Sequence, residues 1–211
     1  MGLNEQATRL FVIRHGETAW NVDTRIQGQL DIPLNDTGHW QAGRLALALA
    51  GEGIAAIYSS DLQRAAQTAG ALAQATGLGL VTDVGLRERA FGSFEGATFR
   101  EIEQRWPDDA RRWRQREPDF GPGGGETLSA FYERSVAAAT RLAALHPGQA
   151  IALVAHGGVL DCLYRAASRI ALGAPRTWQL GNASINRLLH SPEGLALVGW
   201  NDTHHLEHPP G

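Results

Sequence analysis

The sequence contains no lysine, so all 19 of its permanently cationic side chains are arginines. This absence excludes functions that depend on a lysine, such as a P-loop nucleotide site, a Schiff base to pyridoxal phosphate, or a lysine general base. The single cysteine, Cys162, excludes an internal disulfide and fits a reducing compartment. No apolar run reaches the roughly 18 residues of a membrane helix, and the N-terminal residues do not resemble a signal peptide. We therefore expect a soluble, cytoplasmic protein.

The charge balance gives no sign of a polyanionic partner. The net charge of -3 predicts no binding to nucleic acid or to an acidic membrane surface. With 43% apolar and 19% charged residues, a chain of 211 residues can bury a sizeable core. We predict a single domain over residues 1–211, and the sequence leaves a homodimer open.

Short β-rich segments alternate with helical segments along the chain. The expected strands are residues 9–13, 54–58, 78–84, 150–155, 185–190 and 195–200. The expected helices are residues 40–50, 60–76 and 126–145, with another after 156–158. The helix at 60 is predicted from a capping box, Ser60-Asp61-Leu62-Gln63. This alternation predicts an α/β fold: a three-layer α/β/α domain with a mainly parallel central sheet and a partly helical cap insertion at about 97–125.

Polar residues follow three of the expected strands at the point where each strand ends. His15 lies between Arg14 and a glycine after the first strand, and Arg64 lies one turn inside the helix that follows the second. His156-Gly157 follows the strand at 150–155, and Glu88 follows a further strand candidate. Ligands of an open α/β sheet bind beyond the carboxyl ends of its strands, so these residues are expected to meet there.

These residue types suit phosphoryl transfer. Arginine forks bind phosphate oxygens in pairs, and backbone amides beside a glycine or at a helix N-terminus add donors. Two neighbouring cations disfavour the imidazolium form, so His15 is expected to be a neutral nucleophile near pH 7. Glu88 could protonate the leaving oxygen and later activate water. No metal or cofactor is required if arginines neutralise the developing charge.

Each residue alone also has an ordinary structural explanation. Arg64 could be a surface helix residue, and His156 could be a structural histidine whose hydrogen bonds are satisfied at a strand end. Glu88 lies between Arg87 and Arg89, and the ordinary explanation for such a residue is a solvent-exposed cluster of salt bridges. Their convergence at strand ends favours an active site.

The motifs resemble those of the histidine phosphatase superfamily, in its phosphoglycerate mutase-like branch. The resemblance extends over about residues 9–200. It is carried by Leu10–Thr18 with Trp20-Asn21, Gln27-Gly28, Tyr58–Ala65, Leu86-Arg87-Glu88 with Phe91-Gly92, Gly125-Glu126-Thr127, Val154–Gly158 and Asn182–Ile185.

The resemblance implies roles for individual residues. His15 would be the phosphorylated nucleophile, and Glu88 the proton donor and acceptor. The phosphoryl group would be held by Arg14, Asn21, Arg64, His156 and Gly157. Gln27, Gly28, Arg89 and Phe91 would line the substrate side. The family implies a small phosphorylated metabolite as substrate and no metal.

The choice between phosphatase and mutase depends on the residues after Glu95-Gly96. Mutases similar to this chain carry a lysine there that binds the substrate carboxylate, and this chain has none. The glycine-rich loop at 121–125 is closer to the phosphatase pattern. We therefore predict a phosphomonoester phosphatase. Phosphoglycerate mutase remains the alternative, with Arg100 or Arg112 in place of the lysine.

Other classes have less support. A metal-dependent hydrolase could use His15, Glu88, His156 and Asp161, or the late histidines 204, 205 and 208. A cysteine phosphatase needs an arginine six positions after its cysteine, and position 168 is a serine. The Gly-x-Ser-x-Gly motif of esterases is absent. A non-catalytic module that binds a phosphorylated ligand is also open, although all of the expected catalytic residues are retained.

Overall fold

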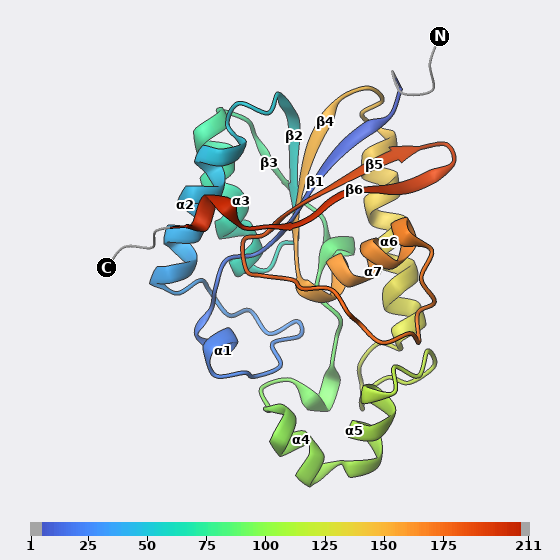
Figure 1. Cartoon of the computed structure of the whole chain (residues 1–211). Helices are drawn as coiled ribbons and strands as arrows, with labels where there is room; N and C mark the ends of the chain where they lie inside the picture. The colour runs from blue at the N-terminus through green and yellow to red at the C-terminus, as the bar shows by residue number, and fades with distance from the viewer. Residues whose placement is uncertain (1–5, 208–211) are drawn as a thin grey trace.

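In the computed structural model, which describes residues 6–207, six strands form one mixed sheet in the order β3-β2-β4-β1-β5-β6 (Figure 1). The strands are β1 (Thr8–Arg14), β2 (Ile54–Ser59), β3 (Leu80–Thr82), β4 (Ala150–Ala155), β5 (Ile185–Ser191) and β6 (Gly194–Asp202). Strands β1 to β4 are mutually parallel, whereas β5 and β6 close the sheet as an antiparallel hairpin. The predicted α/β class and mainly parallel sheet are confirmed.

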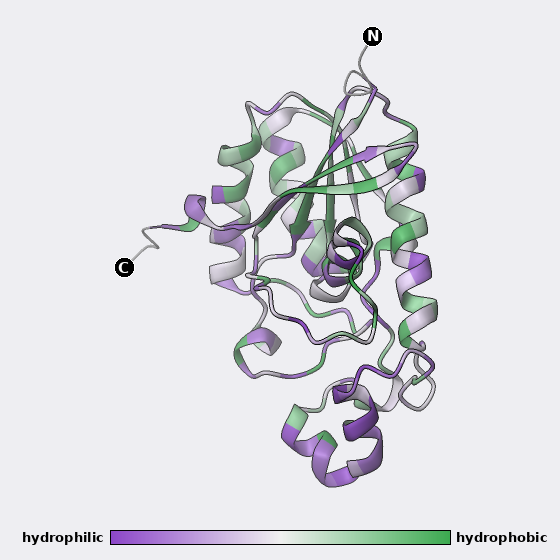
Figure 2. Cartoon of the chain, turned by 45° about the vertical axis from the view of Figure 1, so that its right-hand side comes forward, coloured by the Kyte–Doolittle hydropathy of each residue, from purple (hydrophilic) through white to green (hydrophobic). Residues whose placement is uncertain are grey.

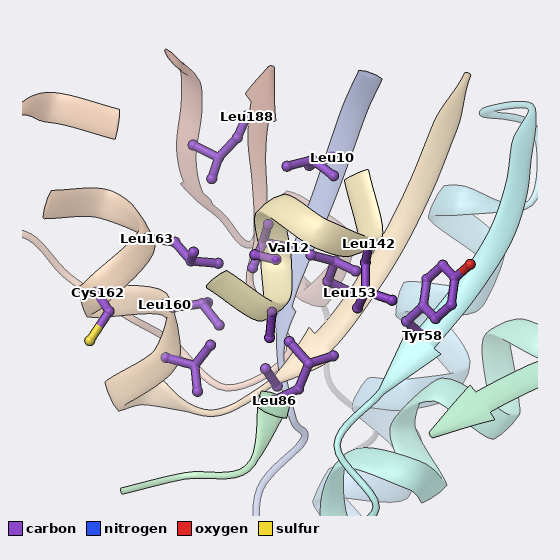
Figure 3. Packing of buried hydrophobic residues seen from close by; sticks show 14 of the residues in the cluster. Leu10, Val12, Tyr58, Leu86, Leu142, Leu153, Leu160, Cys162, Leu163 and Leu188 are labelled. Atoms are coloured by element: carbon purple, nitrogen blue, oxygen red, sulfur yellow. The ribbon is translucent and has the colours of Figure 1, made fainter. Parts of the chain in front are cut away.

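Helices cover both faces of the sheet, because alternate residues of each strand point to opposite sides. On one face lie α2 (Asp36–Leu49) and α3 (Gln63–Thr76), which pack against Phe11 and Ile13 of β1. On the other face lie α6 (Leu128–Ala144) and α7 (Gly157–Ser168), which pack against Leu10 and Val12 (Figure 3). This is the predicted three-layer arrangement. No helix within residues 6–207 has the length and apolar character needed to span a membrane.

Capping interactions explain where the observed helix boundaries differ from the predicted ones. Helix α2 begins at Asp36 and not at Trp40, since the Asn35 side chain accepts the Gly38 N–H at 2.8 Å. Helix α6 likewise begins at Leu128, with Thr127 as its cap. The prediction of a capping box at Ser60 is wrong.

Helix α3 begins three residues later than predicted, at Gln63. The Gln63 N–H donates to Asp31 Oδ1 at 2.7 Å, so a distant loop provides the cap. The expected strand at 78–84 is also shorter, since only Leu80–Thr82 pairs with β2.

Residues 97–117 form two short helices, α4 (Phe99–Arg105) and α5 (Pro107–Arg114), away from the sheet (Figure 1). Pro107 separates them, because a proline is tolerated in the first turn of a helix and not in its interior. Figure 2 shows that the two helices consist largely of hydrophilic residues. Beneath it lies a small apolar cluster of Phe94, Ala97, Ile102, Ala110 and Phe120. The assignment of residues 1–211 to one domain with a cap stays a prediction.

The shorter helical segments were not predicted. Within residues 6–207 they are α1 (Ala19–Val22) and the 3₁₀ turns at Val84–Leu86, Gly92–Phe94 and His204–Leu206. Of these, α1 matters for the site, because it follows the loop that carries His15.

Candidate active site

Three loops that follow neighbouring parallel strands meet at one edge of the sheet. Arg14 is the last residue of β1 and is in register with Ala155, the last residue of β4. His156 follows directly, and Arg64 lies in the first turn of α3, which follows β2 on the other side of β4. The structure thus brings these residues together. Arg14, His15, Arg64 and Glu88 line a cavity of about 210 Å³, and His156 lies behind it against His15 and Arg64.

His15 presents one ring nitrogen to this cavity. Its Nδ1 lies 2.7 Å from the Gly16 carbonyl oxygen, which can only accept, so Nδ1 carries the proton. The lone pair is therefore on Nε2. Burial lowers the pKa of His15 well below its ordinary value, and the charges of Arg64 and Arg14 lower it further. The direction is the expected one, but burial contributes more to the lowered pKa than either arginine alone.

His156 has the opposite arrangement of donor and acceptor. Its Nδ1 accepts the Arg64 Nε–H at 3.2 Å, so the proton is on Nε2. That N–H is buried and has no hydrogen-bond partner within residues 6–207. The pKa of His156 is also lowered well below its ordinary value, first by burial and then by Arg64. The rings of His15 and His156 are 5.3 Å apart between centroids. The Nε2 lone pair of His15 and the Nε2–H of His156 are thus both free, on two rings that lie close together.

Arg64 is 1% exposed, and three of its N–H groups are already used inside the protein. Besides the bond to His156, Nη1 donates to the Leu30 carbonyl at 2.8 Å and Nη2 to the Gly28 carbonyl at 2.7 Å. A guanidinium has five N–H groups, so two remain for a ligand. Burial lowers the pKa of Arg64 to about 10, which leaves it cationic at neutral pH.

Arg14 is held in a similar way. Its Nη1 donates to the Leu180 carbonyl at 2.5 Å. Its Nε is buried and has no hydrogen-bond partner in the described part of the chain. Burial is the main cause that lowers its pKa. An unpaired buried N–H is costly, so such groups are typical of a site that is completed by an anionic ligand.

Both carboxylate oxygens of Glu88 are fixed by backbone amides. The Arg89 N–H donates to Oε1 at 2.8 Å, and the Gly158 N–H donates to Oε2 at 2.9 Å. A Cβ atom at position 158 would overlap Oε1 and lie 3.0 Å from the Phe131 ring. Only glycine allows this approach, so Gly158 positions Glu88. Sequence reasoning singled out Gly157 and missed Gly158, although both belong to the same motif.

Asn21 reaches the cavity from α1. Its Oδ1 accepts the N–H and the Oγ1–H of Thr18, both at 3.0 Å, in a capping box. Asn182 donates to the same oxygen at 3.3 Å. Since the oxygen is used by these donors, the side chain offers its amide N–H groups to the cavity, as a phosphate ligand requires.

The residues predicted to bind the rest of the substrate separate into two groups. Gln27, Gly28 and Phe91 line the cavity. Arg89 does not: it is 4% exposed, and its Nε and Nη2 donate to the carbonyls of Glu126 and Phe120. It lines a second, neighbouring cavity instead.

Arg25 and Ile26 also line the first cavity and were not predicted. Arg25 is placed there by hydrogen bonds to the Gly96 carbonyl and to Glu101 at the start of α4. Nothing in the local sequence distinguishes it from a surface arginine, so no sequence signal identifies it.

A metal site has no support in the arrangement of side chains. Within residues 6–207, no three His, Cys, Asp or Glu side chains are grouped as metal ligands. The Nδ1 lone pair of His156 is taken by Arg64, and Asp161 is bound by two arginines. Of the late histidines, His204 contacts Glu207, and residue 208 lies outside the described residues.

Comparisons with known proteins agree with this geometry. The model of the histidine phosphatase superfamily (branch 1) matches residues 10–203. A phosphoglycerate mutase-like protein of Arabidopsis thaliana is 39% identical over 203 residues, which cover 94% of this chain and 86% of the relative. A metal-independent phosphoserine phosphatase of the same plant is 34% identical over 207 residues, which cover 97% and 85%.

A solved structure gives the same result. That of a mycobacterial glucosyl-3-phosphoglycerate phosphatase is 34% identical, with a TM-score of 0.83 over 92% of this chain and 99% of that one. The family model, the relatives and the fold therefore all indicate the same superfamily. The chain belongs to branch 1 of the histidine phosphatase superfamily, whose enzymes work through a phosphohistidine intermediate.

Proposed function

We propose that this enzyme hydrolyses phosphomonoesters of small metabolites, with His15 as the nucleophile. The Nε2 lone pair attacks phosphorus, the ester oxygen leaves as the alcohol, and phosphate is held on His15. Water then attacks the phosphohistidine, releases inorganic phosphate and restores neutral His15. The observation that carries this proposal is the bond from His15 Nδ1 to the Gly16 carbonyl, which leaves Nε2 free.

The phosphoryl group would be bound by donors that are fixed before it arrives. These are the two remaining N–H groups of Arg64, the Nε–H of Arg14, the Nε2–H of His156 and the amide of Asn21. The backbone N–H of Gly157, at the start of α7, is a further donor. Two guanidinium groups neutralise charge that a metal would otherwise neutralise. Turnover is therefore expected to persist in EDTA, and loss of activity that a single divalent ion restores would contradict this mechanism.

Glu88 would serve as acid in the first half-reaction and as base in the second. Its protonated form gives a proton to the leaving oxygen, and its carboxylate then takes one from the attacking water. The two backbone N–H groups that bind Glu88 stabilise the carboxylate formed after the first transfer.

A phosphoglycerate mutase on the same residues is the second candidate. It is favoured by the likeness to a mutase-like relative. Against it, the chain has no lysine, and neither Arg100 nor Arg112 is among the residues that line the cavity. Arg112 binds Glu117 at 2.7 Å instead. Incubation with 3-phosphoglycerate is expected to release inorganic phosphate and to form no 2-phosphoglycerate.

Trapping of the intermediate tests the proposal directly. The enzyme is mixed with p-nitrophenyl phosphate, quenched rapidly without acid, and mapped by mass spectrometry. Phosphate is expected on His15. Label on His156, or on no residue during measurable turnover, would overturn the assignment of the nucleophile.

A cytoplasmic location is also proposed, on the grounds that the one cysteine, Cys162, is a buried free thiol. The homodimer stays a prediction. Gel filtration with light scattering would decide the oligomeric state.

A further inference from the structure

A second cavity lies directly beside the first and is more than twice as large. Its volume is about 510 Å³, against about 210 Å³ for the cavity around His15. Glu88 and Phe91 line both, so the second cavity begins at the residue that is proposed to protonate the leaving oxygen. A leaving group that extends past Glu88 would enter it.

This second cavity carries an excess of positive charge. Arg89, Arg114, Arg116 and Arg176 line it, together with the carboxylates of Glu88 and Asp161. The charge of Asp161 is already balanced, because its Oδ2 accepts from Arg116 at 2.7 Å and from Arg165 at 3.0 Å.

Arg176 differs from the other arginines of this cavity. Arg114 pairs with Glu103, and Arg89 is bound by carbonyls. By contrast, Arg176 is exposed, and no carboxylate within residues 6–207 forms a salt bridge with it. Arg176 is therefore a cation at the cavity with its donors available.

Arg116 is fixed at the same cavity by two contacts. Its Nη2 binds Asp161, and its Nε donates to the Leu172 carbonyl at 3.0 Å. Its backbone has a φ of +53°, in the left-handed region that non-glycine residues rarely adopt. Such strain persists only where surrounding contacts hold it. Arg116 and Arg176 thus come from two separate loops, one after α5 and one after α7.

The rest of the wall is apolar. Trp113 packs edge-on against Phe91 with ring centroids 5.6 Å apart, and Leu128 and Phe131 also line the cavity. A carbon chain or ring could pack here while an acidic group reaches the arginines.

We propose that the second cavity binds the leaving group of the substrate and selects one that carries a second anionic group, through Arg176 and Arg116. The substrate class is a phosphomonoester with a carboxylate or a second phosphate several bonds away from the ester. This rests on the proposed phosphatase function, because the cavity has this role only if Glu88 faces the ester oxygen.

A matched pair of substrates tests the subsite. 6-Phosphogluconate and sorbitol 6-phosphate have the same carbon chain, but only the first ends in a carboxylate. The kcat/KM of the wild type is expected to favour 6-phosphogluconate at least about tenfold. Hexane-1,6-diol bisphosphate against its monophosphate tests a phosphate in the same position. The larger of the two ratios identifies the anion that is preferred.

Variants assign the preference to a residue. Arg176→Met is expected to lower the anionic-to-neutral ratio about fivefold, since an exposed ion pair contributes modestly, and Arg176→Lys to restore part of it. Arg111→Met is the matched control. Arg111 is an exposed arginine of the same region that pairs with Asp108 and lines neither cavity. It is expected to keep the wild-type ratio.

Failure of the subsite and failure of the phosphatase proposal give different results. If the wild type hydrolyses p-nitrophenyl phosphate but has the same kcat/KM for both members of each substrate pair, the subsite is overturned and the phosphatase function stands. An equal loss on charged and neutral esters in Arg176→Met would mean that Arg176 acts on the ester phosphate, which also overturns the subsite. No hydrolysis of any ester, p-nitrophenyl phosphate included, overturns the proposed function.

Discussion

Arg14 and Arg64 of the cavity around His15 are held differently from Arg114 and Arg176 of the second cavity. In the cavity around His15, Arg64 is buried and Arg14 is half-buried, and main-chain carbonyls bind both. In the second cavity, Arg176 is exposed, and Arg114 pairs with Glu103 while its own side chain is 60% exposed.

A guanidinium bound by the backbone cannot turn away, so it is preorganised for the charge of a transition state. An exposed one has a loose geometry and can be replaced with little effect on the fold. This difference suggests that the first cavity serves chemistry common to many substrates, and that the second one serves substrate choice.

The largest effect is expected for His15→Ala, which should lower kcat by at least about 10⁴-fold on every phosphomonoester. His156 cannot replace it, because the Nδ1 lone pair of His156 accepts from Arg64. Steady-state hydrolysis of p-nitrophenyl phosphate measures the loss. The matched control is His190→Ala, a histidine of β5 outside both cavities. Activity within tenfold of wild type would rule out His15 as the nucleophile.

Glu88→Gln should discriminate between leaving groups. An alkyl phosphate leaves as a basic alkoxide and needs the proton, so its burst of phosphoenzyme formation should slow by about 10²- to 10⁴-fold. The p-nitrophenyl ester leaves as a stabilised anion, and its burst should slow far less. First-turnover rates are needed, because the second half-reaction uses Glu88 with both esters. Equal slowing would mean that Glu88 only shapes the pocket.

Gly158→Ala should reproduce part of that effect without removing the carboxylate. The new methyl group would overlap Oε1 of Glu88, so the side chain must move. A displacement of about 1 Å costs on the order of 10- to 100-fold in rate, here mainly on alkyl esters. Gly70→Ala is the control, since its added Cβ meets nothing within 4 Å. An unchanged alkyl burst rate would show that Glu88 tolerates the methyl group.

The smallest effect concerns pH and stability. The pKa values of His15 and His156 lie well below those of the unfolded chain, so between these values the unfolded state binds more protons. The free energy of unfolding should therefore fall as the pH drops below about 6.5, by up to about 1.4 kcal/mol per pH unit for each histidine. Urea titrations from pH 7 to 5 measure this slope. His190 and His205 act in the same direction, so the informative quantity is the shallower slope of His15→Ala.

Much of the site could be predicted because its residues lie next to strands in the sequence. Arg14, His15 and His156 follow β1 and β4, and adjacent parallel strands end at one edge of the sheet. Arg89 shows where such reasoning fails. Its neighbour Glu88 lines both cavities, whereas Arg89 lines only the second, where the carbonyls of Glu126 and Phe120 bind its guanidinium.

Other features depend on contacts between distant parts of the chain. The cap of α3 comes from Asp31, 32 residues before Gln63, and no local pattern at Ser60 reveals it. The protonation of the His15 ring depends on the conformation of the Gly16 carbonyl. Positions of this kind follow only from coordinates.

The internal hydrogen bonds of Arg64 link two functions that are separate in the sequence. The guanidinium that would bind phosphate is also bound to the carbonyls of Gly28 and Leu30, next to the predicted substrate-binding residues Gln27 and Gly28. The loop and the guanidinium are therefore thermodynamically coupled. By reciprocity, the factor by which bound phosphate changes the affinity of this loop for a leaving group equals the factor by which the leaving group changes the affinity for phosphate.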